Sequence, residues 1–254
     1  MTFDVDPDAR VARWLAALEH RHLTDLTPSE LARALRALSS CYVERRARLA
    51  DGGALGTAGK RAAFALFYAP VHLLTTRSIV RELAIPGDRI SHLHDLGCGT
   101  GAAGAGWAID SGSVRVSGVD RHPWAVAEAN WTYRQLSIRG RAAQLDVSRA
   151  RIVADKRTGI IAAYTVNELP DATRAALLEK LLQARARGAA VLIVEPIARR
   201  VSPWWNGWAR PFAAAGGRED QWRFAVPLPP RQRDLARAAG LNPRELTART
   251  LFLD

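Results

Sequence analysis

Cysteine is scarce in this 254-residue chain: Cys41 and Cys98 are the only two, and they lie far apart. The sequence therefore offers neither a disulfide framework nor a CxxC zinc site, and we expect no metal site and a reducing, cytoplasmic setting. Long apolar runs are also missing. The longest uncharged run, Ala62 to Thr76, is too short to cross a bilayer, so we expect no membrane partner. Asp4, Asp6 and Asp8 argue against a signal peptide.

Lysine is scarce as well, with three residues, yet the formal net charge is +11 because arginine is abundant. Residues 1–90 carry 13 basic and 10 acidic side chains, residues 91–188 carry 13 and 9, and residues 189–254 carry 10 and 6, giving +3, +4 and +4. The excess is therefore spread along the chain, and a genome-wide coding bias would by itself produce a chain rich in arginine and alanine. One basic segment stands out, and we predict that it faces RNA. Its members are Arg134, Arg139, Arg141, Arg149, Arg151, Lys156 and Arg157, against Asp146 and Asp155.

Glycine is concentrated where it has a chemical use. A short run from Ile90 ends in Asp95-Leu96-Gly97-Cys98-Gly99-Thr100-Gly101, and a helix of small residues, Ala102 to about Asp110, follows. Glycines allow a sharp turn and leave no side chain between the backbone and a ligand. The helix directs free N–H groups and its positive end at that turn. The pattern predicts a cradle for a nucleotide-like ligand.

Two cofactors compete for this cradle. Residues 99–104 satisfy G-x-G-x-x-G, and Asp120 lies about where a dinucleotide-binding protein holds its ribose. The longer pattern, Asp95 followed by Gly97, Gly99 and Gly101, resembles the first motif of class I S-adenosylmethionine (SAM) methyltransferases. Asp120 and Asp146 close the next two predicted strands. Three acids at three successive strand ends favour SAM over NAD.

This resemblance implies a set of cofactor-binding residues. Asp95 would lie near the methionine end of SAM, Asp120 on the ribose hydroxyls and Asp146 on the adenine amino group. The full set that we expect to bind SAM is Asp95, Gly97, Cys98, Gly99, Gly101, Asp120, Arg121, Asp146 and Val147.

The rest of the chain predicts an α/β fold. Residues 1–87 have helical patterns, including a helix over about 60–83 with a kink at Pro70, and we expect them to form a cap that brings Tyr68 and His72 to the site. From residue 88 to 254 strands and helices alternate. The strands include 159–166, a buried 189–196, 222–226 and 246–253, and Asp171 is expected to cap a helix. The resemblance implies a Rossmann-like, mostly parallel sheet with an antiparallel C-terminal edge.

Asn167 and Glu168 are the candidate catalytic residues, because they follow the fourth strand of the predicted domain. Amino-methylating members of the class carry Asn/Asp-Pro-Pro-aromatic at this position. Here Glu168-Leu169 replaces the middle of that turn, so amine methylation by that geometry does not carry over, and Asn167 as a plain turn residue is an equal alternative. Two further groups favour structural interpretations: His92 and His94 share a strand face without a third ligand, and Trp204, Trp205 and Trp208 suit a helix that covers the sheet better than base stacking.

Three features together suggest a subgroup: the helical start, the Asn167-Glu168-Leu169 turn and the strand that ends in Glu195-Pro196. They are similar to the methyltransferase-like proteins of the small ribosomal subunit that are associated with the mitochondrial ribosome. Members typically carry a cysteine cluster after the fifth strand, whereas residues 196–222 contain no cysteine. We therefore expect SAM-dependent methylation of RNA, with ribosomal RNA first. The alternatives are a small-molecule methyltransferase and a non-catalytic SAM-binding ribosome-assembly factor.

Overall fold

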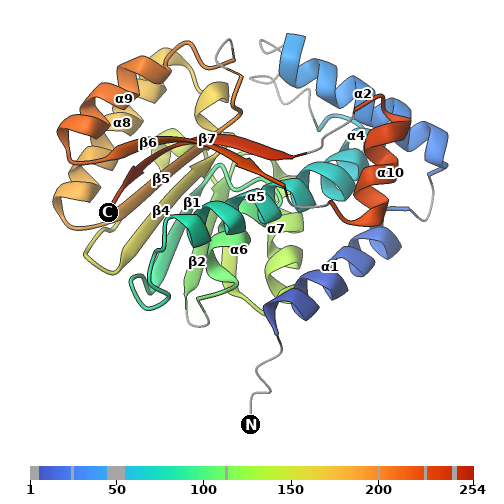
Figure 1. Ribbon diagram of the computed structural model, residues 1–254, viewed down its shortest axis with the longest axis horizontal. Helices are drawn as coiled ribbons and strands as arrows, with labels where there is room; N and C mark the ends of the chain where they lie inside the picture. Colours follow the sequence, from blue (N-terminus) through green and yellow to red (C-terminus); the bar gives the residue numbers. More distant parts are fainter. Residues whose placement is uncertain are drawn as a thin grey trace.

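A computed structural model describes residues 6–23, 26–44, 55–111, 114–198, 201–225, 228–241 and 245–254. The molecule is built on a seven-stranded sheet with the order β3-β2-β1-β4-β5-β7-β6 (Figure 1). The strands are β1 (His92–Leu96), β2 (Arg115–Asp120), β3 (Arg139–Gln144), β4 (Thr158–Ala163), β5 (Ala190–Glu195), β6 (Arg218–Phe224) and β7 (Leu246–Leu253). The first five are parallel, and β7 runs antiparallel to β5 and β6. The predicted fold class is confirmed.

Helices cover both faces of the sheet (Figure 1). One face packs against α5 (Ala69–Glu82), α6 (Ala102–Ala108) and α7 (Pro123–Gln135), in a core that includes Leu93 and Trp107. The other face packs against α8 (Asp171–Ala186) and α9 (Trp205–Ala214). Trp205 and Trp208 are buried in this second core, so they cover the sheet as the structural interpretation predicted.

The N-terminal helices gather at one end of the sheet (Figure 1). They are α1 (Pro7–His22), α2 (Pro28–Glu44) and α4 (Ala58–Ala63), and α10 (Pro230–Ala238) joins them from the far end of the sequence. Thr27 and Glu30 form a reciprocal cap at the start of α2: the Thr27 N–H donates to Glu30 Oε2 at 2.9 Å, and the Glu30 N–H donates to Thr27 Oγ1 at 3.3 Å. Trp14 and Leu35 belong to the same core as Leu93 of β1.

The predicted kink at Pro70 takes a different form. Residues Phe64–Tyr68 make one π-helical turn, η1, between α4 and α5, and the chain continues as a helix on either side. A proline ring clashes with the carbonyl four residues earlier, and the wider π turn moves that carbonyl away. By length and composition Ala58–Glu82 passes the test for a membrane span, but 67% of its most apolar window is buried inside the structure.

Other boundaries also differ from prediction: β3 ends at Gln144, before Asp146, and β5 spans Ala190–Glu195 rather than 189–196. Strand β4 ends at Ala163 rather than residue 166, because Tyr164 has φ of +58° and leaves the extended conformation. Asp171 does not cap α8. It is the first helical residue after Pro170, and its carboxylate pairs with Arg174. Strand β6 begins at Arg218 rather than 222, since an edge strand tolerates the charged residues there; Val226 lies outside the described residues.

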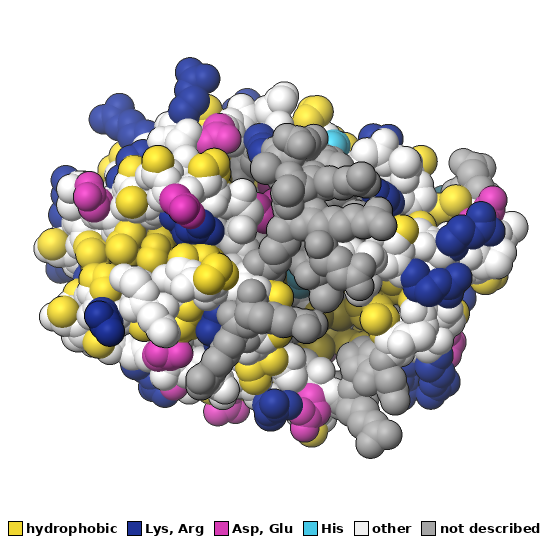
Figure 2. Space-filling view, turned by 90° about the horizontal axis from the view of Figure 1, so that it is seen from above, with side chains coloured by type: hydrophobic (Ala, Val, Ile, Leu, Met, Phe, Trp, Pro, Cys, Tyr) yellow, Lys and Arg dark blue, Asp and Glu magenta, His cyan; other side chains and the backbone are white. Residues whose placement is uncertain are grey.

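The described surface carries its charge in several places. Viewed from above, Lys and Arg side chains lie at separate positions around the molecule, with Asp and Glu among them (Figure 2). All seven basic residues of the Arg134–Arg157 segment are exposed. Of the two cysteines, Cys98 is a buried free thiol, and the side chain of Cys41 lies outside the described residues.

Candidate functional site

A cavity of about 590 Å³ opens at the carboxyl ends of the parallel strands. This is where open α/β sheets bind ligands, and the volume suits a small organic molecule. Nine of the eleven predicted site residues line it: Gly97, Cys98, Gly99, Asp120, Arg121, Asp146, Val147, Asn167 and Glu168. The other two, Asp95 and Gly101, are not among its lining residues.

The glycine turn has positive φ angles, which residues other than glycine adopt only with strain. Gly97, Gly99 and Gly101 have φ of +70°, +52° and +75°. A Cβ on Gly97 would lie 2.4 Å from the Thr165 side chain, and one on Gly101 would lie 2.8 Å from the Tyr133 ring. Gly101 therefore allows α7 to pack closely against the start of α6, and the turn can present its backbone to a ligand.

Asp95 is buried behind the turn, with 1% of its surface exposed. Its Oδ2 accepts a hydrogen bond of 3.1 Å from the N–H of Gly104, in the first turn of α6. Burial raises the pKa of Asp95 to about 7, and the nearby Asp120 charge adds to the increase. Asp95 thus fastens the helix to the end of β1.

Asp120 connects the glycine turn to the next strand. One carboxylate oxygen accepts from the Gly99 N–H at 2.9 Å, and the other accepts from the His122 N–H at 2.8 Å. Asp146 lies two residues beyond β3, where its Oδ1 accepts from the Ser148 hydroxyl at 2.5 Å and from the Ser148 N–H at 2.8 Å. These hydrogen bonds lower the pKa of Asp146. Both acids therefore face the cavity in fixed orientations, and each carboxylate retains acceptor capacity.

Asn167 lies in a hydrogen-bond network at the opposite end of the cavity. Asn167 follows β4, in the 3₁₀ turn η3 (Val166–Glu168), and its backbone N–H donates to Glu195 Oε1 at 3.1 Å. Its side-chain amide donates to Glu195 Oε2 and accepts from Trp204 Nε1 at 2.8 Å. Glu195 is fully buried at the end of β5 and also lines the cavity.

Four aromatic side chains form a wall of the cavity. Phe64, Tyr68, His72 and Tyr164 all line it, so the two predicted cap residues do reach the cavity. The His72 and Tyr164 rings stack with centroids 4.0 Å apart. Burial lowers the pKa of His72 to about 3 and raises that of Tyr164, so both rings are neutral at pH 7.

Sequence reasoning missed Tyr164 and Glu195 as site residues. Glu195 stands at a strand end, the same signal that identified Asp120, and that rule alone identifies it. Tyr164 reaches the cavity from a backbone conformation that tyrosine adopts rarely, and the sequence carries no sign of it.

His92 and His94 are each occupied by protein contacts. Their rings stack at 4.6 Å, and their Nε2 atoms contact Ser117 Oγ at 2.9 Å and the Val153 carbonyl at 3.1 Å. Among the described residues, no group of three or more His, Cys, Asp or Glu side chains is placed to hold a metal ion.

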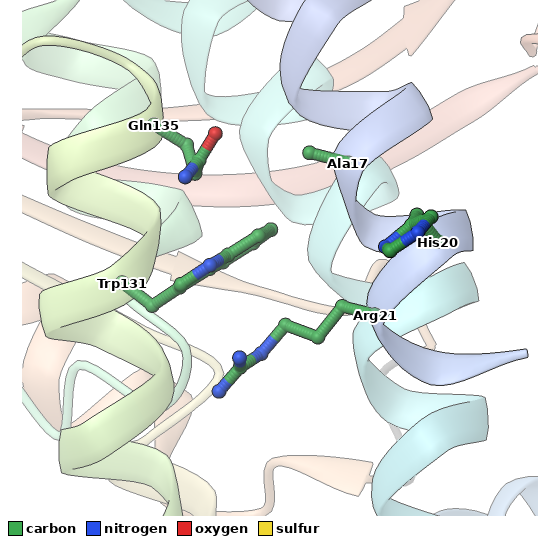
Figure 3. A pocket seen from close by; sticks show the side chains of 5 residues that line it. All are labelled: Ala17, His20, Arg21, Trp131 and Gln135. Carbon is green, nitrogen blue, oxygen red and sulfur yellow. The ribbon is translucent and has the colours of Figure 1, made fainter. Parts of the chain in front are cut away.

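A second, more open depression of about 500 Å³ lies between α1 and α7 (Figure 3). Its lining residues are Ala17, His20, Arg21, Trp131 and Gln135. Arg21 lies over the Trp131 ring, 5.0 Å from its centroid, and pairs with Glu128 at 3.1 Å. The depression contains none of the predicted site residues.

Comparison with known proteins gives a likeness of fold. No family model matches the chain, and no curated protein matches its sequence. Among solved structures, the mitomycin 7-O-methyltransferase MmcR is 15% identical with a TM-score of 0.53, over 97% of this chain and 71% of that one. The plantazolicin methyltransferase BpumL, in complex with a monoazolic desmethylPZN analog and SAH, is 12% identical with a TM-score of 0.50, over 89% and 97%. The chain thus has the Rossmann-like fold of class I SAM-dependent methyltransferases.

Proposed function

We propose that this protein is a SAM-dependent methyltransferase. The observation that carries the proposal is the cavity itself: a glycine turn with positive φ angles and two oriented acids, Asp120 and Asp146, face one space of about 590 Å³. SAM contains hydroxyl, amino and adenine groups that such a set can bind. BpumL, which has this fold, is described in complex with SAH.

Each predicted residue has a role that its position supports. The backbone of Gly97 and Gly99 receives the amino-acid part of SAM, Asp120 accepts from ribose hydroxyls, and Asp146 accepts from the adenine amino group. Arg121 and Val147 line the same end of the cavity. Asp95 and Gly101 act indirectly, since they hold the turn and α6 in place.

At the acceptor end this chain positions and desolvates the nucleophile. SAM supplies an activated methyl group, and its transfer needs the acceptor held in line more than covalent assistance. The wall of Phe64, Tyr68, His72 and Tyr164 suits a planar acceptor. Glu195, oriented by Asn167, offers a buried carboxylate that can accept a hydrogen bond from the attacking group.

RNA is the first acceptor that we propose, with ribosomal RNA as the leading substrate. The exposed basic segment of residues 134–157 supports it, since Arg149 follows directly after the cavity-lining residues Val147 and Ser148. A nucleobase turned out of its stack is planar and fits an aromatic wall. The resemblance to the ribosome-associated methyltransferase-like proteins also points to this substrate.

A small molecule is the second acceptor, and the aromatic wall favours it independently of charge. The names of MmcR and BpumL describe mitomycin and plantazolicin as acceptors. A small planar compound would bind among the same four rings without any contact to the arginines.

We also propose that residues 1–87 form a cap on the methyltransferase domain of residues 88–254. Phe64, Tyr68, Val71 and His72 support this division, because these four residues of η1 and α5 line the cavity opposite the strand ends.

Calorimetry with S-adenosylhomocysteine tests the cofactor. We expect micromolar binding that is lost in Gly99→Arg, because a side chain at this position carries φ strain and enters the cavity. NADH binding in place of S-adenosylhomocysteine would refute the proposal.

A labelling experiment separates the acceptors. The protein is incubated with tritiated SAM and a cell lysate, with and without prior RNase treatment. RNase-sensitive label supports RNA, and label in small extractable products supports the small molecule. RNA retention without label, combined with binding of S-adenosylhomocysteine, supports the non-catalytic assembly factor.

A further inference from the structure

The sheet face formed by β1, β2 and β3 on the α8 side lacks a helical cover. Residues 145–157, which connect β3 to β4, form one 3₁₀ turn, η2 (Val147–Arg149), and otherwise no regular structure. Helix α8 packs over β4 and β5 instead, with Leu177 and Leu181 in the same core as Ile160 and Val191. Val153, in the connecting segment, is 67% exposed.

The strand register places basic and aromatic residues together on this face. His92, Arg115 and Arg139 are in register across the three strands, and so are His94, Ser117 and Arg141 two residues further along. The intervening Leu93 and Val116 point to the other face and belong to the core with α6 and α7. We call these six residues the basic sheet face.

The three arginines of the basic sheet face have no carboxylate partner within the part of the chain that the structure describes. All three are exposed, and Arg115 lies directly opposite Arg139 in register. Like charges in this relation destabilise a sheet. Some exposed arginines elsewhere, among them Arg81, Arg218 and Arg223, pair with an acid.

Asp155 is an acid close to this face. It is close enough to His92 for their charges to interact, and its Oδ1 is already occupied by the Arg157 N–H at 2.8 Å and the Thr158 hydroxyl at 2.9 Å. The positive charge of the face is therefore not neutralised by an ion pair within the described residues, and it is available to an anion from outside the chain.

We propose that the basic sheet face is the docking site for single-stranded RNA. Arginines at regular strand spacing suit successive phosphates, and the stacked imidazole rings of His92 and His94 offer a flat surface for a base. The segment after β3 lies next to both the face and the cavity: Asp146, Val147 and Ser148 line the cavity, and the Val153 carbonyl contacts His94 of the face. The proposal rests on RNA as the partner but not on methyl transfer.

The test is fluorescence anisotropy with a labelled single-stranded RNA dodecamer over a series of KCl concentrations. Arg139→Ala/Arg141→Ala is compared with Arg210→Ala/Arg233→Ala, which removes two exposed arginines from α9 and α10. For the first pair we expect Kd to rise at least tenfold at 100 mM KCl. The slope of log K against log salt should fall by about 1.4, about 0.7 for each lost phosphate contact. The control pair should change Kd less than twofold.

Several outcomes would overturn the proposal. Equal losses in both pairs would mean diffuse attraction to the whole positive surface, and absence of RNA binding by the unmodified protein would exclude the site. Displacement of the RNA by polyglutamate of equal charge would indicate an acidic protein partner. A dimer that Arg139→Ala/Arg141→Ala dissociates in sedimentation would indicate a second copy of the chain. Binding of S-adenosylhomocysteine, measured on the same variants, should stay unchanged, so failure here is distinguishable from failure of the methyltransferase proposal.

Discussion

At the scale of single residues, the Asp120 carboxylate accepts hydrogen bonds from the backbone N–H groups of Gly99 and His122, and it also faces the cavity. Asp120→Ala removes the acceptor proposed for the ribose and leaves those two N–H groups without their partner. We expect the Kd for S-adenosylhomocysteine to rise about thirtyfold, equivalent to about 2 kcal/mol for hydrogen bonds to a charged group. Calorimetry measures it, with Asp234→Ala on exposed α10 as the matched control. Affinity within twofold of the unmodified protein would remove Asp120 from the site.

Asp95 predicts a pH dependence of stability. Burial raises its pKa from 3.8 to about 7 in the folded protein, so between these values the folded state binds a proton that the unfolded state has released. Its contribution therefore falls as pH rises from about 4 to 7 and is constant above, an effect of at most about 4 kcal/mol. Asp95→Asn keeps an oxygen that accepts from Gly104 and cannot ionise.

We expect the Tm of Asp95→Asn minus the Tm of the unmodified protein to increase as pH rises from 5 to 8. Thermal unfolding without cofactor at several pH values checks this expectation. A difference in Tm that is constant across the range would contradict the raised pKa.

Asn167 distinguishes a positioning role from a plain turn. In Asn167→Ala the Glu195 carboxylate loses its amide donor and the Trp204 indole loses its acceptor. We expect kcat for transfer of tritiated methyl to fall about tenfold to a hundredfold, or about 1.4–3 kcal/mol, with the Kd for S-adenosylhomocysteine nearly unchanged. Trp204→Phe, which removes only the indole N–H, should have a smaller effect. Equal losses of transfer and cofactor binding would assign Asn167 to the turn alone.

The residues of the cavity divide into those that sequence can identify and those that it cannot. Gly97, Gly99, Asp120 and Asp146 can be identified from short sequence patterns. A glycine-rich turn after a strand, or an acid at a strand end, is visible within a few consecutive residues. Contacts between Asn167, Glu195 and Trp204 join segments 28 to 37 residues apart and depend on side-chain directions that no local pattern contains.

At the scale of elements, the packing of α5 against α6 depends on one glycine. A Cβ on Gly106 would lie 2.5 Å from the carbonyl oxygen of Leu73, so Gly106→Ala must push the two helices apart. We expect it to lower the free energy of unfolding by about 1–3 kcal/mol. Gly207→Ala in α9 is the control, since nothing lies within 4 Å of its added Cβ, and it should stabilise by about 0.5–1 kcal/mol. Urea denaturation compares the two. A loss in Gly207→Ala equal to that in Gly106→Ala would contradict this account of the interface.

Element types were more predictable than element ends. The strand over residues 246–253 is confirmed at both ends; apolar residues stand at both ends, and seven of its eight residues are buried. Strand β6 begins four residues earlier than predicted, since its start is polar and only pairing with β7 identifies it as a strand. The π turn before Pro70 depends on how the helix relieves a steric clash, which periodicity does not describe.

At the scale of the whole molecule, the N-terminal helices and the sheet share interior contacts. Trp14, Leu35 and Leu93 belong to one core, and the buried Arg77 of α5 pairs with Asp8 of α1 and with Asp110 after α6. Glu128 of α7 is likewise buried and contacts Arg21 and His22 of α1. The proposed cap is therefore joined to the sheet by a common core and by buried ion pairs.

Unfolding should therefore be cooperative across residues 1–254. Leu35→Ala removes a fully buried side chain from α2, and we expect a loss of about 2–5 kcal/mol. That loss should lower the unfolding midpoint by the same amount whichever probe measures it. The reason is that α2 and β1 share one core, so the N-terminal helices should not unfold before the sheet. Far-ultraviolet circular dichroism reports the helices, and fluorescence of Trp107, buried against the sheet, reports the body once the other tryptophans are replaced by phenylalanine. Coincident midpoints in both backgrounds support one folding unit. An earlier transition confined to helical signal, with Trp107 unaffected, would show that the helices of residues 1–87 unfold as a domain of their own.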